Sequence, residues 1–502
     1  MRTARTPHAS RAARSRRVAL LAAAGLLVAA CSGGGDITDS GEEPATTVST
    51  VPGDTVAPTT TVAPDLLPDC PTDALASATG TTEIMFWHGM SSTLAEELQR
   101  LADVYNSSQS KVHVTLVGES YELTIDNYLQ ADPANKPDLV QLPEYMVQAV
   151  VDTESTVPVG KCIEASGFDT SAFLPTALTA YSTQGMQWGM PFNVSNPVLY
   201  YNKKAFVAAG LDPNKPPQSL EELREFSQQI VDSGAATYGL ALDSGFDSGG
   251  GWYVEQWVAK AEEYYVDGDN GRTNRATQVL YNNDTGVELL TYMQDMINDG
   301  LAVSVGDNAT GTDDLVKIAD EQQPAAMAIH TSAALGGALD LLASGIFPQL
   351  SVDDLGIGPM PGPGGQPGAL IGGASLWPVN SEDPVRIAAA WDFLTYLVGA
   401  QQQSEWAATT GYIPVRTDAL ELDPYKTTLA TDPRFSVAYE QLLASPDALT
   451  SAGPVVGPLR EMRSVLAAAI SAIFAGADVK TTLDAAAEQA NNLIADYNAR
   501  NT

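Results

Sequence analysis

The hydrophobic positions of the chain recur with two periods. Runs of alternating or continuous apolar residues predict strands, because side chains of a strand point alternately to the two faces of a sheet. Apolar residues three and four positions apart predict helices with one buried face. Strands are expected at 81–87, 112–118, 137–143, 197–202 and 325–330, and helices at 93–108, 219–234, 287–300 and 383–400. The alternation of the two kinds of element predicts α/β lobes with largely parallel sheets.

The first 30 residues have a pattern of their own. Six arginines and no acidic residue precede an apolar run from Val18 to Ala30. Such a run is too short for the roughly 30 Å bilayer core, which takes about 20 residues in a helix, so residues 1–30 are predicted to be a signal peptide. The small residues before Cys31 are similar to a lipobox, which predicts that Cys31 is lipidated. The alternative is ordinary cleavage nearby, which would leave Cys31 as a free thiol.

Residues 31–68 are rich in Gly, Ser, Thr, Pro and Val. This composition buries too little apolar surface to offset the entropy of folding, so the segment is predicted to be a disordered tether between the lipid and a folded body. The 434 residues that follow are too many for one core and suit two domains.

The net charge of the mature chain excludes two classes of partner. Removal of the signal peptide takes away six of the 26 basic residues. The mature chain then has 20 basic and 61 acidic residues, which gives a net charge of −41. A surface of this charge repels nucleic acid and anionic lipid head groups. Contact with the membrane is therefore expected only through the N-terminal lipid, and an anionic ligand would need a local basic group.

The remaining cysteines and the histidines carry little catalytic signal. Cys70 and Cys162 are an even pair, which predicts one disulfide in an oxidising compartment. The histidines His88, His113 and His330 are not spaced as metal ligands, and neither a nucleophile elbow nor a phosphate-binding glycine loop occurs. We expect no metal, no cofactor and no catalytic residue, and hence no enzyme.

Several stretches resemble one family in their order and spacing. They are "FWHGM" at 86–90, "PFNVSNPVLYYNKKAF" at 191–206, "LIGGASLW" at 370–377, "TGYIPV" at 410–415 and "GPLREMRSV" at 457–465. Together they resemble the extracytoplasmic glycerol-3-phosphate-binding proteins of ABC importers, from about residue 80 to the C-terminus.

The resemblance implies a fold with two α/β lobes, a multi-strand hinge and a ligand cleft between the lobes, as in type II periplasmic binding proteins. Carried onto this chain, the first lobe would hold residues 69–194 and 370–427. The second lobe would hold residues 195–369 and 428–502. Closure of such lobes over a ligand is a known hinge motion.

An arginine pair offers the charge that a phosphate ligand needs. Arg460 and Arg463 lie three residues apart near the start of a predicted helix, where the guanidinium fork and the positive helix end both favour an anion. The resemblance assigns the phosphate to Arg463, although the spacing alone does not decide between the two arginines.

The resemblance assigns further contacts one by one. Tyr412 would donate its hydroxyl to the ligand, the backbone of Gly373 would approach it, and Ser195 would supply a neutral donor. Tyr121 and Glu144 would hold the polyol end, where a carboxylate accepts hydrogen bonds from hydroxyls.

Two departures from the family concern the ligand. Thr331 stands where the family has serine, and the paired tryptophans of the family fall in a stretch with an insertion at 243–257. Trp252 is expected to supply one ring, while Phe246 is an open candidate for the other. An altered aromatic wall would suit the quaternary ammonium of a glycerophosphodiester such as glycerophosphocholine, so monoester and diester both stay open.

The function implied by the resemblance is capture of a small glycerophosphate ligand by a lipid-anchored, monomeric binding protein, followed by delivery to an ABC permease and its ATPase. One alternative keeps the fold but binds a neutral oligosaccharide similar to maltose or trehalose. Another is a secreted hydrolase that acts on glycerophosphodiesters.

Overall fold

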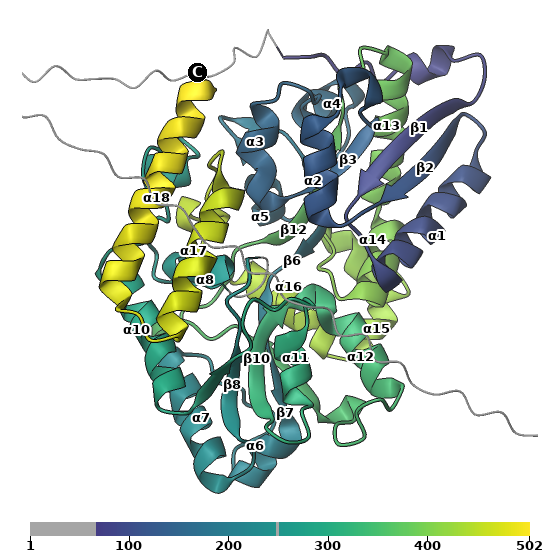
Figure 1. The fold of residues 1–502 in the computed structure, drawn as a ribbon. Coiled ribbons are helices and arrows are strands. Elements are labelled where there is room, and N and C mark those ends of the chain that lie inside the picture. The colour runs from purple at the N-terminus through teal and green to yellow at the C-terminus, as the bar shows by residue number, and fades with distance from the viewer. Residues whose placement is uncertain (1–66, 247–249, 502) are drawn as a thin grey trace, which may run out of the picture. The chain divides into compact units, whose positions relative to one another are not determined.

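Two five-stranded sheets organise the computed structural model, which describes residues 67–246 and 250–501 (Figure 1). The first sheet has the order β2 (Val112–Gly118), β1 (Thr82–His88), β3 (Leu139–Pro143), β12 (Gly372–Pro378) and β6 (Met190–Ser195). The second has the order β11 (Leu355–Pro359), β7 (Pro197–Asn202), β10 (Ala325–Thr331), β8 (Tyr238–Leu242) and β9 (Ala302–Ser304). A short hairpin joins β4 (Ser182–Thr183) and β5 (Met186–Gln187).

Helices pack on both sheets. They are α1 (Ser92–Ser108), α2 (Tyr121–Gln130), α3 (Val147–Val151), α4 (Val159–Ser166), α5 (Pro175–Ala180), α6 (Lys203–Ala209), α7 (Leu220–Ser233), α8 (Gly250–Lys260), α9 (Asp267–Asn270), α10 (Asp284–Asn298), α11 (Asp313–Ile318), α12 (Leu335–Ala343), α13 (Pro384–Leu397), α14 (Ala400–Thr410), α15 (Tyr425–Thr431), α16 (Arg434–Leu443), α17 (Leu459–Phe474) and α18 (Val479–Arg500). Helices α1, α2 and α13 contact the first sheet, whereas α7 and α11 contact the second. Helix α17 packs against α8, α10 and α18 (Figure 1).

One strand in each sheet runs against its neighbours. Strand β12 is antiparallel to β3 and β6, and β7 is antiparallel to β10 and β11, while the pairs β1–β2, β1–β3, β10–β8 and β8–β9 are parallel. The prediction of α/β lobes with largely parallel sheets is therefore confirmed. Only Asn196 separates β6 from β7, so the chain passes there directly from the first sheet to the second.

The chain returns to the first sheet between β11 and β12. We call the part built on the first sheet the first lobe and the part built on the second sheet the second lobe. The predicted boundaries at 195, 370 and 428 stay predictions, because the sheets alone do not assign the helices to a lobe.

The predicted strands follow the burial of their side chains. Strand β2 has the bounds expected from the sequence and buries Val112 and Val114 while the residue between them is exposed. Strand β3, which lies in the middle of its sheet, is buried at every position. The alternating and the continuous apolar patterns thus correspond to a peripheral and a central strand.

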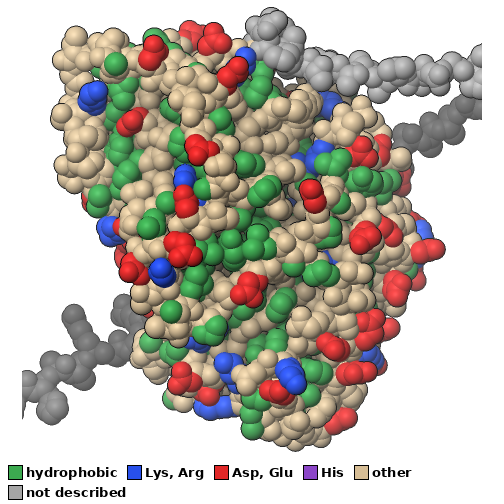
Figure 2. Space-filling model, turned by 180° about the vertical axis from the view of Figure 1, so that it is seen from behind, with side chains coloured by type: hydrophobic (Ala, Val, Ile, Leu, Met, Phe, Trp, Pro, Cys, Tyr) green, Lys and Arg blue, Asp and Glu red, His purple; other side chains and the backbone are tan. Residues whose placement is uncertain are grey.

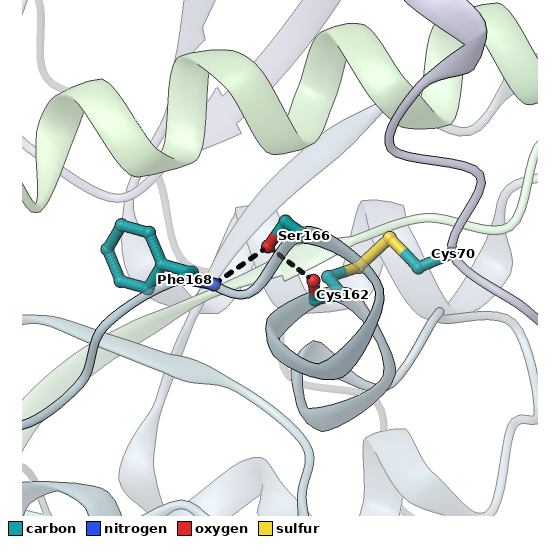
Figure 3. Close-up of a disulfide and its surroundings, with 4 residues drawn as sticks. All are labelled: Cys70, Cys162, Ser166 and Phe168. Atoms are coloured by element: carbon teal, nitrogen blue, oxygen red, sulfur yellow. Dashed lines mark hydrogen bonds between the residues drawn. A yellow bond between two sulfur atoms is a disulfide. The ribbon is translucent and has the colours of Figure 1, made fainter.

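Cys70 and Cys162 form a disulfide with an S–S distance of 2.00 Å and a Cα–Cα distance of 4.9 Å (Figure 3). It joins the segment before β1 to α4, in which the hydroxyl of Ser166 donates to the carbonyl of Cys162 at 2.7 Å. Both cysteines are buried. The bond therefore fixes the start of the folded body to α4.

Replacement of both cysteines by alanine is expected to lower the free energy of unfolding by about 2–4 kcal/mol, because the bond closes a long loop in the unfolded chain. The two residues are 92 positions apart in the sequence. Chemical denaturation of the variant and the oxidised protein measures the difference. Equal stability of the two would mean that the bond does not constrain the unfolded chain.

His88 gives the fold a predictable response to acid. Its side chain is buried, its Nδ1 accepts a hydrogen bond from the N–H of Met90 at 3.2 Å, and burial lowers its pKa to about 4. His88 therefore binds a proton less readily in the folded state than in the unfolded state. The free energy of unfolding is expected to fall as the pH decreases from 6.5 towards 4. A His88→Gln variant should lose less stability in this window, as followed by denaturation at several pH values. A His113→Gln variant, altered at an exposed position of β2, is the matched control, and identical pH profiles for both variants would contradict the prediction.

The N-terminal predictions lie outside the described residues. They are the signal peptide at 1–30, the lipidated Cys31 and all but the last two residues of the tether at 31–68. Within the described part of the chain, no helix combines the length and the apolar character needed to cross a membrane. The face in Figure 2 carries acidic side chains spread over its surface with fewer basic ones among them, in line with the net charge.

Candidate ligand-binding site

Arg463 is the buried cation at the centre of the site. It lies on α17, is 3% exposed, and donates from Nε and Nη2 to the two carboxylate oxygens of Glu255 at 2.7 and 2.7 Å. Nη2 also donates to Glu144 Oε1 at 3.0 Å, and the guanidinium carbon lies 4.9 Å from the centre of the Tyr145 ring. One cation thus faces two carboxylates, which gives this buried cluster a net charge of −1 when all three groups are ionised.

The electrostatics of the cluster are asymmetric. Burial alone would lower the pKa of Arg463, but Glu255 and Glu144 outweigh it and hold the pKa well above its ordinary value. Burial raises the pKa of Glu144, Arg463 opposes this shift, and the neighbouring charge of Glu255 adds to it. Arg463 is therefore permanently charged, and Glu144 is a carboxylate whose negative charge the cluster stabilises poorly.

A relay of hydrogen bonds leads to the hydroxyl of Tyr121. The N–H of Gly89 donates to Gln141 Oε1 at 2.9 Å, Gln141 Nε2 donates to Asn193 Oδ1 at 2.7 Å, and Asn193 Nδ2 donates to the oxygen of Tyr121 at 2.9 Å. The oxygen of Tyr121 is an acceptor in this relay, so its own proton is directed to another group.

Two further tyrosines adjoin Tyr121. Burial raises the pKa of Tyr121, Tyr181 and Tyr412, and the charge of Glu144 raises it further for Tyr181 and Tyr412. The ring of Tyr412 stacks on Trp406 at 5.6 Å, which fixes its orientation. The buried hydroxyl of Tyr181 has no hydrogen-bond partner among the described residues. The three phenols remain protonated and can act as neutral donors near Glu144.

Strands β6 and β12 carry the next group of predicted residues. A Cβ atom on Gly372 would lie 2.7 Å from the ring of Trp252 and 3.4 Å from Ser195 Oγ, so the three residues adjoin one another. Gly373 has φ 94°, and a Cβ there would lie 2.0 Å from the carbonyl oxygen of Asn193. Glycine at 373 is thus required by the close pairing of β12 with β6.

A cavity of about 640 Å³ adjoins Trp252. Its lining residues are Ser120, Glu122, Pro197, Phe246, Trp252, Tyr253, Asp307, Asn308, Ala309, Thr310, Gly311, Ile329, His330 and Thr331. Phe246 packs edge-on against Tyr145 with ring centres 5.5 Å apart. Since Tyr145 also contacts Arg463, the two rings lie between the arginine and the cavity.

The structure divides the predicted residues into connected groups. Tyr121, Glu144, Tyr412 and Arg463 belong to the buried polar cluster, Trp252 and Thr331 line the cavity, and Ser195 and Gly373 lie on the paired strands beside Trp252. Phe246, left open from the sequence, lines the cavity.

Arg460 is not part of this site. It donates to Asp126 of α2 at 2.7 Å, and both side chains are partly exposed. Of the two arginines of α17, only Arg463 adjoins the residues that the resemblance selects.

The sequence missed three groups of the site. Glu255 follows Trp252 by three residues on α8, and this helical spacing could have placed both on one face. Tyr145 adjoins the predicted Glu144 in the sequence. Tyr181 lies next to β4, and no pattern in the sequence distinguishes it from a core tyrosine.

Residues 100–433, more than half of the chain, match the family described as bacterial extracellular solute-binding protein. The sn-glycerol-3-phosphate-binding periplasmic protein UgpB of Pectobacterium atrosepticum is 28% identical over 432 residues, which cover 84% of this chain and 93% of that protein. This similarity confirms the resemblance predicted from the sequence.

Two solved structures share the fold. UgpB from Mycobacterium tuberculosis in complex with glycerophosphocholine is 21% identical, with a TM-score of 0.64, and covers 84% of this chain and 100% of that chain. The GacH receptor of Streptomyces glaucescens, solved without ligand and with acarbose, is 17% identical, with a TM-score of 0.68 and the same two coverages of 84% and 100%. The predicted two-lobed fold of the binding proteins is thereby confirmed.

Proposed function

Because the chain belongs to the bacterial extracellular solute-binding proteins, we propose that it captures sn-glycerol-3-phosphate or a glycerophosphodiester such as glycerophosphocholine for import by an ABC transporter. The observation that carries the proposal is the buried guanidinium of Arg463 beside three protonated tyrosines. One fixed positive charge with several neutral donors suits a phosphate that also carries hydroxyl groups. The names of UgpB from two organisms support the same ligand class.

The phosphate subsite is Arg463. Its Nη1 is in no hydrogen bond with a described residue, so two N–H groups are available to an oxygen of the ligand. Glu144 is the more weakly held carboxylate, because its 3.0 Å bond is the longest of the three and its pKa is raised. A phosphate oxygen takes its place on Nη2, and the released Glu144 accepts hydrogen bonds from the glycerol hydroxyls.

The remaining donors follow from their positions. The hydroxyls of Tyr121, Tyr181 and Tyr412 donate to the ligand near Glu144, and Ser195 and Thr331 contribute neutral oxygens on the side of Trp252. The backbone of Gly373 contacts the ligand beside Ser195. No reaction takes place on the chain, in line with relatives that are named as binding proteins.

The protein acts outside the cytoplasm. A lipid on Cys31 holds it at the membrane, residues 31–68 act as a tether, and the folded body reaches a permease with its ATPase as a monomer. Metabolic labelling with a fatty acid tests the anchor, since a Cys31→Ser variant would not incorporate it.

A neutral oligosaccharide is the second candidate ligand. Arg463 is already paired with two carboxylates, and the rings of Trp252 and Phe246 form the kind of wall on which sugars stack. The GacH receptor was solved with acarbose, a sugar-like ligand for the same fold.

Calorimetric titration of the purified protein with glycerol-3-phosphate, glycerophosphocholine and maltose decides between the candidates. Binding of a phosphate ligand but not of maltose is the expected result. Binding of maltose alone would show that the ligand is a neutral oligosaccharide and would contradict the proposed phosphate ligand.

A further inference from the structure

Arg272 is a buried cation outside the polar cluster of Arg463. It lies two residues after α9 and is 8% exposed, and burial lowers its pKa to about 10, so it is charged at neutral pH. In the described part of the chain its guanidinium contacts backbone carbonyl oxygens and no carboxylate. A buried charge is costly unless hydrogen bonds compensate for the lost water. The position of these carbonyls therefore determines where this side chain is stable.

The guanidinium of Arg272 uses all of its donors. Arginine has five N–H groups in a planar fork, and each of them donates to one carbonyl oxygen. The acceptors are Thr179 at 2.8 Å and Ser182 at 3.0 Å for Nη1, Ala180 at 3.4 Å and Ala452 for Nη2, and Gly453 at 2.8 Å for Nε. One side chain thus joins residues 179–182 to residues 452–453.

The loop that carries Arg272 is docked on the segment that leads into α17. The N–H of Val455 donates to the carbonyl of Asn270 at 2.8 Å, and Nδ2 of Asn270 donates to the carbonyl of Leu449 at 3.3 Å. Gly271 has φ 72°, and a Cβ there would lie 2.0 Å from the carbonyl oxygen of Val455. This side of the contact is therefore closely packed and connected to the helix that holds Arg463.

The other side of the contact surrounds Tyr181. Thr179 and Ala180 end α5, and Ser182 begins the two-residue strand β4, so the three carbonyls lie directly before and after Tyr181. Carbonyls at the end of a helix lack partners within the helix, and Arg272 supplies the donors. The hydroxyl of Tyr181 is buried without a partner among the described residues, and the charge of Glu144 raises its pKa, so this hydroxyl adjoins the site.

We propose that Arg272 is a positioning residue of the ligand site, which holds the hydroxyl of Tyr181 in place relative to Arg463. This inference rests on the proposed function, in which Tyr181 donates to the ligand. Because all its N–H groups are occupied, Arg272 acts on the ligand only through Tyr181. A lysine at 272 would keep the charge but has three donors, so at least two of the five carbonyls would lose their partner.

A double-variant cycle tests the inference, with sn-glycerol-3-phosphate and glycerophosphocholine as the titrated ligands. Arg272→Lys and Tyr181→Phe should each weaken the binding of the phosphate ligand about tenfold in calorimetric titration. The double variant should bind within about threefold of either single variant, because both changes remove the same contact. Independent effects would multiply to about a hundredfold loss.

Arg275→Lys is the matched control. Arg275 lies three residues later in the same loop, and its hydrogen bonds go to Asp152 and Asn498. A lysine there can keep the ion pair with Asp152, so the affinity should change less than about threefold. A tenfold loss in this control would mean that any change of a guanidinium in the loop weakens binding, which contradicts a specific role of Arg272.

The remaining outcomes each decide the question. Multiplied losses in the double variant, or full affinity in Arg272→Lys, would overturn the inference. Tyr181→Phe removes only a hydroxyl that has no partner among the described residues, so this variant should fold, and its full affinity would also contradict the inference. Thermal unfolding shows whether Arg272→Lys folds. If it does not, Arg272 holds the whole fold and not one side chain, and the inference is wrong. Failure of the unaltered protein to bind either phosphate ligand would overturn the proposed function instead.

Discussion

An Arg463→Met variant is expected to lose the binding of phosphate ligands and about 3–5 kcal/mol of unfolding free energy. Methionine fills much of the space of the arginine stem but leaves the carboxylates of Glu144 and Glu255 in a buried place without their cation. The destabilisation should be smaller at pH 5 than at pH 7, because Glu144, whose pKa is already raised by burial, then binds a proton more readily. Chemical denaturation at both pH values and calorimetric titration measure the two effects.

The same helix supplies the control. Arg460 lies three residues earlier, and the side chains of its ion pair with Asp126 are 23% and 43% exposed. Its replacement by methionine should change the unfolding free energy by less than about 1 kcal/mol and leave ligand affinity unchanged. Loss of phosphate binding in Arg460→Met but not in Arg463→Met would reverse the assignment.

A double variant separates stability from binding. Arg463→Met combined with Glu255→Gln removes one of the two unpaired charges, so it should recover part of the lost stability. Phosphate binding should stay absent, because the guanidinium is still missing. Recovery of binding together with stability would show that Arg463 acts only by holding the fold.

Gly373→Ala is expected to lower the unfolding free energy by at least about 2 kcal/mol. The backbone at 373 has φ 94°, which disfavours any L side chain, and the added Cβ would lie 2.0 Å from the carbonyl oxygen of Asn193. Since β12 pairs with β6 at this point, the strain falls on the strand that carries Ser195. Thermal unfolding gives the loss of stability, and titration gives the accompanying loss of affinity.

Substitutions at two other glycines serve as controls for Gly373→Ala. A Cβ on Gly337, in α12, has no heavy atom within 4 Å and no positive φ, so Gly337→Ala should leave stability equal or raise it by up to about 1 kcal/mol. Gly372→Ala pushes on the ring of Trp252 at 2.7 Å and should weaken ligand binding more than stability. If Gly373→Ala were as stable as Gly337→Ala, the close pairing of β12 and β6 would be relaxed in solution.

Part of the candidate site could be predicted from the sequence, because several of its residues lie in short motifs that resemble the family. The resemblance selected Tyr121, Glu144, Tyr412 and Arg463 from separate segments, and the structure brings them into one polar cluster. Their roles as ligand contacts stay proposals.

The hydrogen-bond partners within that cluster could not be predicted from the sequence. Glu255 binds Arg463 from 208 residues away, and the chain offers 61 acidic residues as possible partners. Two residues that line the cavity, Glu122 and Trp252, each have a buried polar atom without a hydrogen-bond partner among the described residues, and this becomes visible only when burial is known.

The sequence by itself predicted five of the strands and four of the helices, because the period of apolar residues is a local property that each segment carries on its own. It also indicated the α/β class and, through short motifs, the family. Only the tertiary structure decided that Arg463 faces Glu144 and Glu255 while Arg460 pairs elsewhere, and that an acidic, aromatic cavity lies beyond Tyr145 and Phe246. Such contacts join residues far apart in the chain, and their energies depend on burial, which the packing of both lobes sets.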